Sequence, residues 1–542
     1  MDHDRWTTVR ARKHVLAVAR NLTSAGRLLD VLPVFGSDPR VQTVFTTVSG
    51  SAFDDGLLAY LEEIQARVIP WRQAVGTRYD LALSASANGD LHRLDAPLLL
   101  MPHGAGHNRL LRTADGYSSE VSGLARSQLM RDGAVVPSAI ALSHPDQVDR
   151  LARYCPEAAP RAVVTGDPCF DRIVAHLPRR DRYRRALDVP PGGTLVLVSS
   201  TWGEHSLLGA GRDLPARLSS ELPLDEFRVA VVAHPNVWKK YGGLQVRLWL
   251  ADARAAGLAL IPPEHGWQAA LIASDVVVGD HGSVTFYGAA LDRPTLLASS
   301  GREHEELDPR SPTAELSRSL PRLDRRRDLL KQIGLAVTAH RPGAHAETTG
   351  RTLAGLGAAQ ERLRRLAYRL MELPSPPGPV VQIPLPEPRA ERQEVTAFLA
   401  QVRFEGDGHA VLRRFPAAAR TGAAEPDPHL VVDEEDLDRR LLESASVVIG
   451  RDRPAEWLQE TLLRYPGAAA PPASVTGDGL VRMSLRGGAG TLLARAPGGG
   501  LDPRCLPPVL YGWAAAGRDP AGLLSVGIGP RSFPVSVTHP AG

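Results

Sequence analysis

The sequence predicts an α/β protein made of two successive α/β halves and a smaller C-terminal α+β domain. Short apolar runs of strand length alternate with helical segments through residues 1–345, which is typical of parallel sheets. The 542 residues are too many for one hydrophobic core. The composition changes after a proline-rich stretch at 374–388, so we expect a separate domain at 389–542.

Composition and charge exclude several classes of protein. The 63 basic and 60 acidic residues leave a net charge of +3, which is not the balance of a nucleic-acid-binding protein. The three cysteines have no metal-ligand or disulfide-scaffold spacing. No apolar stretch approaches the ~20 residues that span a bilayer, and the N-terminal apolar run is too short for a signal peptide. We expect a cytoplasmic protein, at most peripheral at the inner face of the membrane.

The first half, residues 1–178, predicts a parallel sheet with helices between its strands. Polar turns follow several of these apolar runs, as they do where strands end. We expect strands at 14–19, 41–48, 79–83, 97–101, 138–142 and 161–165, and helices at 25–32, 56–69 and 146–154.

The second half, residues 179–345, repeats this alternation. A basic segment at 179–185 is most simply a solvated helix face at the join between the halves. We expect strands at 194–200, 228–233, 256–261, 276–278 and 295–298.

The stretch 271–298 carries the clearest local signal for a ligand. It reads as a buried strand, the polar turn Asp280-His281-Gly282-Ser283 and a helix from Val284 to Leu291. Such a turn directs the free N–H groups of a helix toward whatever lies above the sheet, which suits a phosphate. An ordinary crossover between two strands is the competing interpretation.

Two histidines follow apolar strands directly, at the edge where open α/β sheets bind ligands. His103 comes after the strand at 97–101, and His234 comes after the strand at 228–233. Either residue can instead be a simple turn histidine. His103 and His107 have a spacing of four, but no acidic residue is near and the glycines argue against a helix, so a metal pair is disfavoured.

The C-terminal third indicates little about function. We expect a long amphipathic helix at 347–371 (crossover segment 346–373) and a stiff proline-rich linker at 374–388. Within 389–542 we expect helices at 391–404, 437–442 and 455–465, a strand at 430–432 and a hairpin turn at 487–491.

Five turns that follow predicted strands between residues 95 and 298 have distinctive sequences. They are His103-Gly104-Ala105, Gly166-Asp167-Pro168-Cys169-Phe170-Asp171, Ser199-Ser200-Thr201-Trp202, His234-Pro235, and Gly279-Asp280-His281-Gly282-Ser283-Val284-Thr285-Phe286 followed by Leu291-Asp292-Arg293-Pro294. Together they resemble the CDP-glycerol glycerophosphotransferase family, whose members synthesise teichoic-acid-type polymers of the cell wall. More broadly, they resemble GT-B glycosyltransferases. The resemblance implies two Rossmann-like domains facing across a cleft, with the nucleotide end of the donor on the second domain.

The resemblance also implies a reaction. A glycerophosphate or glycosyl group would move from a nucleotide-activated donor, CDP-glycerol-like or a UDP-sugar, to a hydroxyl of a lipid-linked or polymer acceptor. We expect neither a cofactor nor a metal. His103 is the candidate base, because an imidazole ionises near neutral pH. His234, with Lys239 behind it, would supply positive charge and N–H donors to the diphosphate.

The donor would be held by residues around the second domain's turns. The amides of Gly282 and Ser283 would bind phosphate, and the Ser283 hydroxyl would contact a phosphate oxygen. Asp280 would hold the ribose or shape the turn, and Thr201 would line the same cleft.

The sequence also departs from the family's pattern, which leaves alternatives open. Ala105 replaces a threonine, Gly282 replaces a serine, and His281 stands where an aromatic residue is usual. One alternative is an enzyme like UDP-GlcNAc 2-epimerase. That pattern is only half met, because this chain has Thr285, Phe286 and Tyr287 where the ribose-binding acid of the epimerase would be. Another is a non-catalytic relative that binds a nucleotide or recruits a partner.

Overall fold

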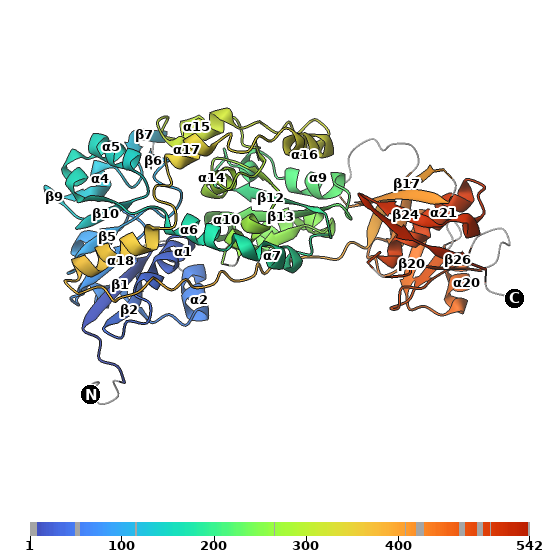
Figure 1. Cartoon of the computed structure of the whole chain (residues 1–542), viewed down its shortest axis with the longest axis horizontal. Coiled ribbons are helices and arrows are strands. Elements are labelled where there is room, and N and C mark those ends of the chain that lie inside the picture. The colour runs from blue at the N-terminus through green and yellow to red at the C-terminus, as the bar shows by residue number, and fades with distance from the viewer. Residues whose placement is uncertain are drawn as a thin grey trace.

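Three large β-sheets follow one another along the chain in the computed structural model (Figure 1). The structure describes residues 8–48, 55–113, 116–264, 266–406, 408–418, 428–465, 472–484, 491–498 and 500–539. The first two sheets are parallel throughout and the third is mixed. The predicted fold class, two Rossmann-like α/β domains and a further C-terminal domain, is confirmed.

The first sheet has seven strands in the order β11-β10-β5-β4-β1-β2-β3. Its strands are nearly continuous apolar runs because helices cover both faces. The strands are β1 (Lys13–Ala19), β2 (Val41–Thr47), β3 (Val68–Ile69), β4 (Leu81–Ser84), β5 (Leu98–Leu100), β10 (Ala139–Leu142) and β11 (Ala162–Val164). The helices are α1 (Leu22–Val31), α2 (Asp55–Glu63), α3 (Trp71–Val75), α4 (Arg126–Leu129), α5 (Pro145–Tyr154) and α6 (Pro168–Ala175), and two small hairpins pair β6 (Leu110–Thr113) with β7 (Gly116–Val121) and β8 (Met130–Arg131) with β9 (Ala134–Val135).

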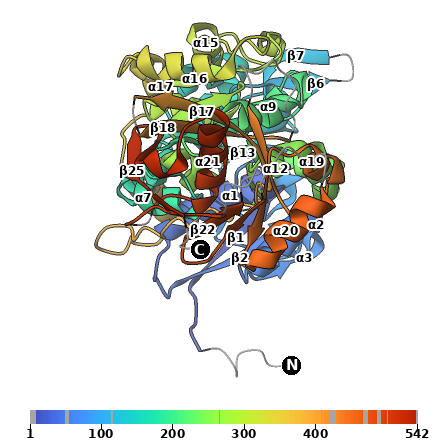
Figure 2. The same ribbon diagram turned by 90° about the vertical axis from the view of Figure 1, so that its right-hand side faces the viewer.

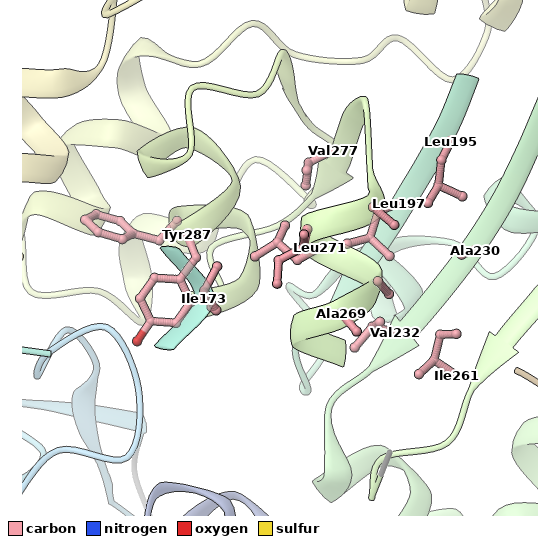
Figure 3. Packing of buried hydrophobic residues seen from close by; sticks show 14 of the residues in the cluster. Ile173, Leu195, Leu197, Ala230, Val232, Ile261, Ala269, Leu271, Val277 and Tyr287 are labelled. Carbon is pink, nitrogen blue, oxygen red and sulfur yellow. The ribbon is translucent and has the colours of Figure 1, made fainter. Parts of the chain in front are cut away.

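The second sheet has five strands in the order β14-β13-β12-β15-β16. The strands are β12 (Thr194–Ser200), β13 (Phe227–Ala233), β14 (Ala259–Ile261), β15 (Val276–Gly279) and β16 (Thr295–Leu297). The helices are α7 (Arg180–Ala186), α8 (Leu207–Ala210), α9 (Leu214–Glu221), α10 (Pro235–Tyr241), α11 (Gly243–Trp249), α12 (Ala251–Ala255), α13 (Trp267–Ala273), α14 (Ser283–Ala290), α15 (Pro312–Ser319) and α16 (Leu329–Thr338). Figure 3 shows part of its core, where Leu197 of β12, Leu271 of α13 and Tyr287 of α14 pack together with Ile173 of α6.

Before the third domain, two predicted helices differ from the observed ones, each for a visible backbone reason. The helix expected at 347–371 is two helices, α17 (Ala346–Gly350) and α18 (Ala359–Leu370), separated by a loop in which Gly355 and Gly357 have positive φ. The helix expected at 56–69 ends at Glu63. Gln65 then takes a left-handed conformation with φ 55°, and the chain continues into β3.

Helix α18 crosses back and completes the core of the first domain (Figure 1). Its Leu363, Leu366 and Tyr368 are buried there, and the Tyr368 ring lies 6.1 Å from the ring of Phe35. The first domain is therefore built from two separate parts of the chain.

The proline-rich segment 374–388 runs against the second domain. Leu385 is buried in the same cluster as α6 and α13. Its N–H donates to Nε2 of His176 at 3.1 Å, and its carbonyl accepts from the hydroxyl of Tyr183 at 3.3 Å. The segment is thus fixed by specific contacts as well as by its prolines.

The third domain contains a ten-stranded sheet in the order β25-β24-β18-β17-β19-β20-β21-β22-β23-β26. Figure 2 shows α21 lying over these strands. The strands are β17 (Ala397–Glu405), β18 (His409–Pro416), β19 (His429–Asp433), β20 (Val447–Arg451), β21 (Pro472–Val475), β22 (Val481–Ser484), β23 (Thr491–Arg495), β24 (Ser525–Ile528), β25 (Arg531–Pro534) and β26 (Ser536–Thr538). The helices are α19 (Arg439–Ser444), α20 (Ala455–Arg464) and α21 (Leu506–Ala515).

The expected helix at 391–404 is wrong, because β17 occupies most of that range. β17 pairs with β18 over eight residues and with β19 on its other side. Phe398 and Ala400 alternate into the core, which is the period of a strand. The expected turn at 487–491 lies largely outside the described residues, although β22 and β23 on either side of it pair antiparallel.

In the part of the chain that the structure describes, no helix combines the length and the apolar character needed to cross a bilayer.

Candidate functional site

In the second sheet the strand order reverses between β12 and β15, because β13 and β14 are added on one side of β12 whereas β15 and β16 are added on the other. The turns that follow β12 and β15 meet at this point. Ligands of open α/β sheets bind at such a switch point, beyond the carboxyl ends of the strands. Thr201 follows β12 and Asp280 follows β15. The Thr201 N–H donates to Oδ2 of Asp280 at 2.8 Å, so the two turns form one unit.

Asp280 organises these turns through backbone hydrogen bonds. Its Oδ2 also accepts from the Leu207 N–H at 2.8 Å, and its Oδ1 accepts from the Gly282 N–H at 3.1 Å. The side chain is buried, and this burial raises its pKa in spite of the amide donors. These contacts are those of a residue that shapes the turn.

The Gly282-Ser283 turn faces the first domain. Gly282 precedes α14, and the Ser283 hydroxyl accepts a hydrogen bond from the Ala105 N–H at 3.2 Å. A Cβ atom on Gly104 would lie 2.4 Å from Oγ of Ser283. The lack of a side chain at Gly104 therefore lets the two domains touch here.

His103 follows β5 and holds its imidazole in one defined tautomer. Its Nδ1 lies 3.2 Å from the Ala85 carbonyl oxygen. Because a carbonyl oxygen only accepts, Nδ1 carries the proton and Nε2 keeps a lone pair. The side chain is open to solvent. Restricted hydration by the surrounding protein lowers the pKa of His103, and the positive charges of Arg27 and Arg109 lower it further.

His234 holds the opposite tautomer. It caps α10, and its Nδ1 accepts from the Asn236 N–H at 3.1 Å, so the ring proton is on Nε2. Burial lowers the pKa of His234 to about 3, and the nearby Arg109 guanidinium and His103 imidazole lower it further. At neutral pH His234 is thus an uncharged N–H donor. This corrects the expectation that it supplies positive charge.

Lys239 lies in the last turn of α10, and its side chain is half-buried. It is more than one helical turn from His234, which caps the other end of the helix.

Arg109 joins the two domains at the centre of the site, and sequence reasoning missed it. Its guanidinium donates to the Thr201 hydroxyl at 3.0 Å and lies 3.0 Å from Nε2 of His281. It also pairs with Glu306 at 3.0 Å and lies 4.8 Å from the ring centroid of Trp202. Its position six residues after His103 was the only signal available in the sequence.

A second group, also missed, ties α1, α6 and α14 together. Arg27 is 3% exposed and donates to Oδ1 of Asp167 at 2.6 Å. The Tyr287 hydroxyl donates to Oδ2 of the same carboxylate at 2.6 Å. Burial and the Asp167 charge together raise the pKa of Tyr287 well above its usual value. This buried Arg27–Asp167–Tyr287 group fixes the domains against each other beside the candidate site.

The remaining predicted turns have structural roles. Gly166 has φ +91°, and a Cβ atom there would lie 2.8 Å from the Ala354 carbonyl oxygen. Asp171 accepts from the backbone N–H groups of Gly357 and Ala359, both at 2.8 Å, and so fixes the loop before α18. His107 donates from Nδ1 to the Ser122 carbonyl at 3.2 Å. Within the described ranges, no three His, Cys, Asp or Glu side chains are grouped as metal ligands.

Comparisons with known proteins give likenesses of structure only. No protein-family model matches the chain. No curated protein matches it either. Among solved structures, a variant of the wall teichoic acid polymerase TagF has 12% identity and a TM-score of 0.44, over 67% of this chain and 90% of that one. A putative UDP-N-acetylglucosamine 2-epimerase from Listeria monocytogenes has 15% identity and a TM-score of 0.42, over 69% and 100%. A glycosyltransferase from Rickettsia africae has 12% identity and a TM-score of 0.38, over 67% and 100%.

Proposed function

We propose that the chain is a GT-B-type transferase that moves a glycerophosphate or glycosyl group from a nucleotide-activated donor to a hydroxyl acceptor. The observation that carries this proposal is the pair of complementary imidazoles at one domain junction. His103 offers a lone pair on Nε2, whereas His234 offers an N–H on Nε2. A transfer reaction needs both functions, a base for the acceptor and a donor for the leaving group.

His103 acts as the base in this mechanism. The acceptor hydroxyl gives its proton to Nε2 of His103 as its oxygen forms a bond to the transferred group. For a CDP-glycerol-like donor, that bond forms at the terminal phosphorus while the bond to the bridging oxygen breaks, and CMP leaves with the electron pair. The lowered pKa of His103 keeps the imidazole neutral, and therefore able to accept a proton, at pH 7.

The second domain stabilises the leaving nucleotide. His234 donates its Nε2–H to a phosphate oxygen, and Arg109, which its ion pair with Glu306 holds at the junction, adds guanidinium N–H donors. The N-terminus of α14, which begins at Ser283, adds its dipole to the same side of the junction. Thr201 and Asp280 hold these groups in place rather than reacting.

The donor class is tested with a panel of CDP- and UDP-linked compounds, measuring CMP or UDP release with and without a hydroxyl acceptor. Acceptor-dependent CMP from CDP-glycerol supports glycerophosphate transfer, and acceptor-dependent UDP supports glycosyl transfer. UDP released from UDP-GlcNAc without any acceptor favours the epimerase-like alternative. If no nucleotide changes the melting temperature of the protein, both enzymatic functions are refuted and the non-catalytic one is favoured.

The base assignment has its own test. His103→Ala should abolish turnover while donor binding, followed by calorimetry, survives. His92→Ala removes an exposed histidine from the same domain and should leave turnover unchanged. Equal loss of binding and turnover in His103→Ala would refute the role of His103 as base.

A further inference from the structure

A pocket of about 530 Å³ lies between the second and third domains. Its volume falls in the range of small-molecule sites. Pro190, Arg228 and Gly257 line it from the second domain, whereas Arg414, Leu501 and Phe533 line it from the third. Both domains are therefore needed to form it.

This pocket is separate from the candidate active site. Pro190 precedes β12, Arg228 lies at the start of β13, and Gly257 precedes β14. These positions are at the amino edge of the parallel sheet. Thr201 and His234 follow the carboxyl ends of β12 and β13, so they lie at the opposite edge.

The wall of the pocket is held in place by a buried arginine. Arg414 is 1% exposed, and it donates to both oxygens of Asp225 at 2.8 and 2.6 Å. It also donates to Asp502 at 2.8 Å, and its carbonyl accepts from the Leu224 N–H at 2.8 Å. Asp225 and Leu224 belong to the second domain, so these contacts fix the third domain against it.

Every carboxylate of the wall already forms an ion pair with an arginine. The lining contains four carboxylates and five arginines. The pairs are Arg414 with Asp225 and Asp502, Arg392 with Asp188, and Arg504 with Glu394 and Asp502.

Two arginines of the wall are left without a carboxylate. Arg228 donates to the main-chain carbonyls of Asp188 at 3.0 Å and Gly257 at 3.4 Å. Arg531 places its guanidinium 5.1 Å from the ring centroid of Phe533. Within the ranges that the structure describes, neither forms an ion pair. Burial lowers the pKa of Arg228, and so does the charge of Arg392, whereas the charges of Asp188 and Asp225 act in the opposite direction.

We propose that this pocket binds a small molecule that carries a phosphate monoester group. Five arginines against four carboxylates leave the wall with an excess of positive charge, and the two guanidinium groups that form no ion pair offer N–H donors to the oxygens of such an anionic group. The guanidinium fork also fits phosphate oxygens. The phosphate is held by Arg228 and Arg531, and the organic part of the ligand lies along Phe533 and Leu501.

The proposal is tested on the full chain by hydrogen exchange with CMP, UMP and glucose 6-phosphate, each compared with its dephosphorylated form and with citrate. We expect the phosphorylated compounds to protect 224–228 and 500–504 and the dephosphorylated forms to give no protection. Arg531→Gln and Arg228→Gln should weaken binding about tenfold or more, the effect of losing one charge-assisted hydrogen bond. Arg403→Gln, which removes an exposed arginine of the third domain, should bind like the wild type.

Protection by citrate or cytidine equal to that by CMP would overturn the phosphate assignment. Absence of protection by all three phosphate monoesters would overturn the site itself. Arg531 is half-buried, so its variant should remain folded, and melting temperature checks this. If Arg228→Gln unfolds the protein, Arg531→Gln alone decides the outcome, and unchanged affinity in it would refute the proposal. Failure of the proposed transfer reaction leaves this test unaffected, because it measures binding at the opposite sheet edge.

Discussion

Gly104 and Ser283 meet across the domain junction so closely that a single methyl group on Gly104 would lie 2.4 Å from Oγ of Ser283. We expect Gly104→Ala to destabilise the protein by about 1–3 kcal/mol through overpacking. Ser283→Ala in the Gly104→Ala background should recover part of that loss, because it removes the clashing atom. Unfolding midpoints of the two single variants and the double variant measure the coupling.

The control for this cycle is Gly26→Ala. Gly26 lies in α1, and a Cβ atom there would have no neighbour within 4 Å. This substitution should be neutral or stabilising, and it should not couple to Ser283→Ala. Strict additivity of Gly104→Ala and Ser283→Ala would contradict the predicted contact.

Tyr287→Phe tests the buried Arg27–Asp167–Tyr287 group. Its hydroxyl donates to a carboxylate, whereas that of Tyr183, another buried tyrosine, donates to the Leu385 carbonyl. Hydrogen bonds to charged groups contribute about 1.5–3 kcal/mol and neutral ones about 0.5–1.5. Tyr287→Phe should therefore lower the unfolding midpoint more than Tyr183→Phe. Equal effects would show that Asp167 does not depend on this donor.

His234→Ala and His144→Ala separate capping from chemistry. Both histidines cap a helix through Nδ1, which accepts a backbone N–H at 3.1 Å in each case. Loss of either cap should cost about 0.5–2 kcal/mol. Only His234→Ala should also lower turnover, by about 10²–10³, because it alone removes a donor to the leaving group. A matching loss of turnover in His144→Ala would mean that the caps act only through stability.

The stability of the protein should fall in mild acid through His234. Burial lowers its folded-state pKa to about 3, whereas an unfolded histidine has a pKa of about 6.5. Between these values the unfolded chain binds a proton that the folded chain does not. The contribution of His234 to the free energy of unfolding is therefore complete above pH 6.5. It is lost as the pH falls toward 3, by about 1.4 kcal/mol per pH unit.

His234→Asn keeps a capping side chain and removes the titrating group. The urea midpoint of this variant should depend less steeply on pH between 6 and 4 than that of the wild type. His107, whose pKa burial also lowers to about 3, should still contribute its own slope. Parallel pH profiles of wild type and variant would contradict the lowered pKa of His234.

Arg109→Gln should move the acid limb of the pH–rate profile to higher pH. The charge of Arg109 contributes to lowering the pKa of His103, so its removal raises that pKa and the base is lost at a higher pH. Turnover should also fall about 10–100-fold for want of a cation at the leaving group. The profile of kcat/KM against pH measures the shift. Arg112→Gln, at an exposed position three residues away, should leave the limb in place, and an equal shift there would argue against a specific role for Arg109.

The sequence predicted the first two sheets well because buried parallel strands read as continuous apolar runs, as in the run 194–200 that forms β12. The third domain was harder. The charged residues Glu391 and Glu394 favour a helix in the sequence pattern, although the strand β17 follows them. Most other strands of this domain are short and belong to a mixed sheet. Pairing between strands distant in sequence decides such a structure, and local propensity does not report it.

At the candidate site, residues that follow strands were predictable and residues that bridge domains were not. The positions of His103 and His234 were predictable because each residue follows the end of a strand. The role of Arg27 depends on Asp167, 140 positions later, and that of Arg109 on Thr201, 92 positions later. A single sequence carries no signal for partners at that distance.

The return of α18 to the first domain has a consequence for how the chain is made. The last strand of the first sheet is complete when residue 164 has been synthesised. The helix that covers the core of this sheet begins at residue 359, about 200 residues later. At ~5–20 residues per second this interval lasts on the order of 10–40 s. The nascent first domain carries an uncovered apolar surface throughout that time. A truncated chain that stops before residue 359 should therefore aggregate or bind chaperones, whereas one that continues through residue 373 buries that surface.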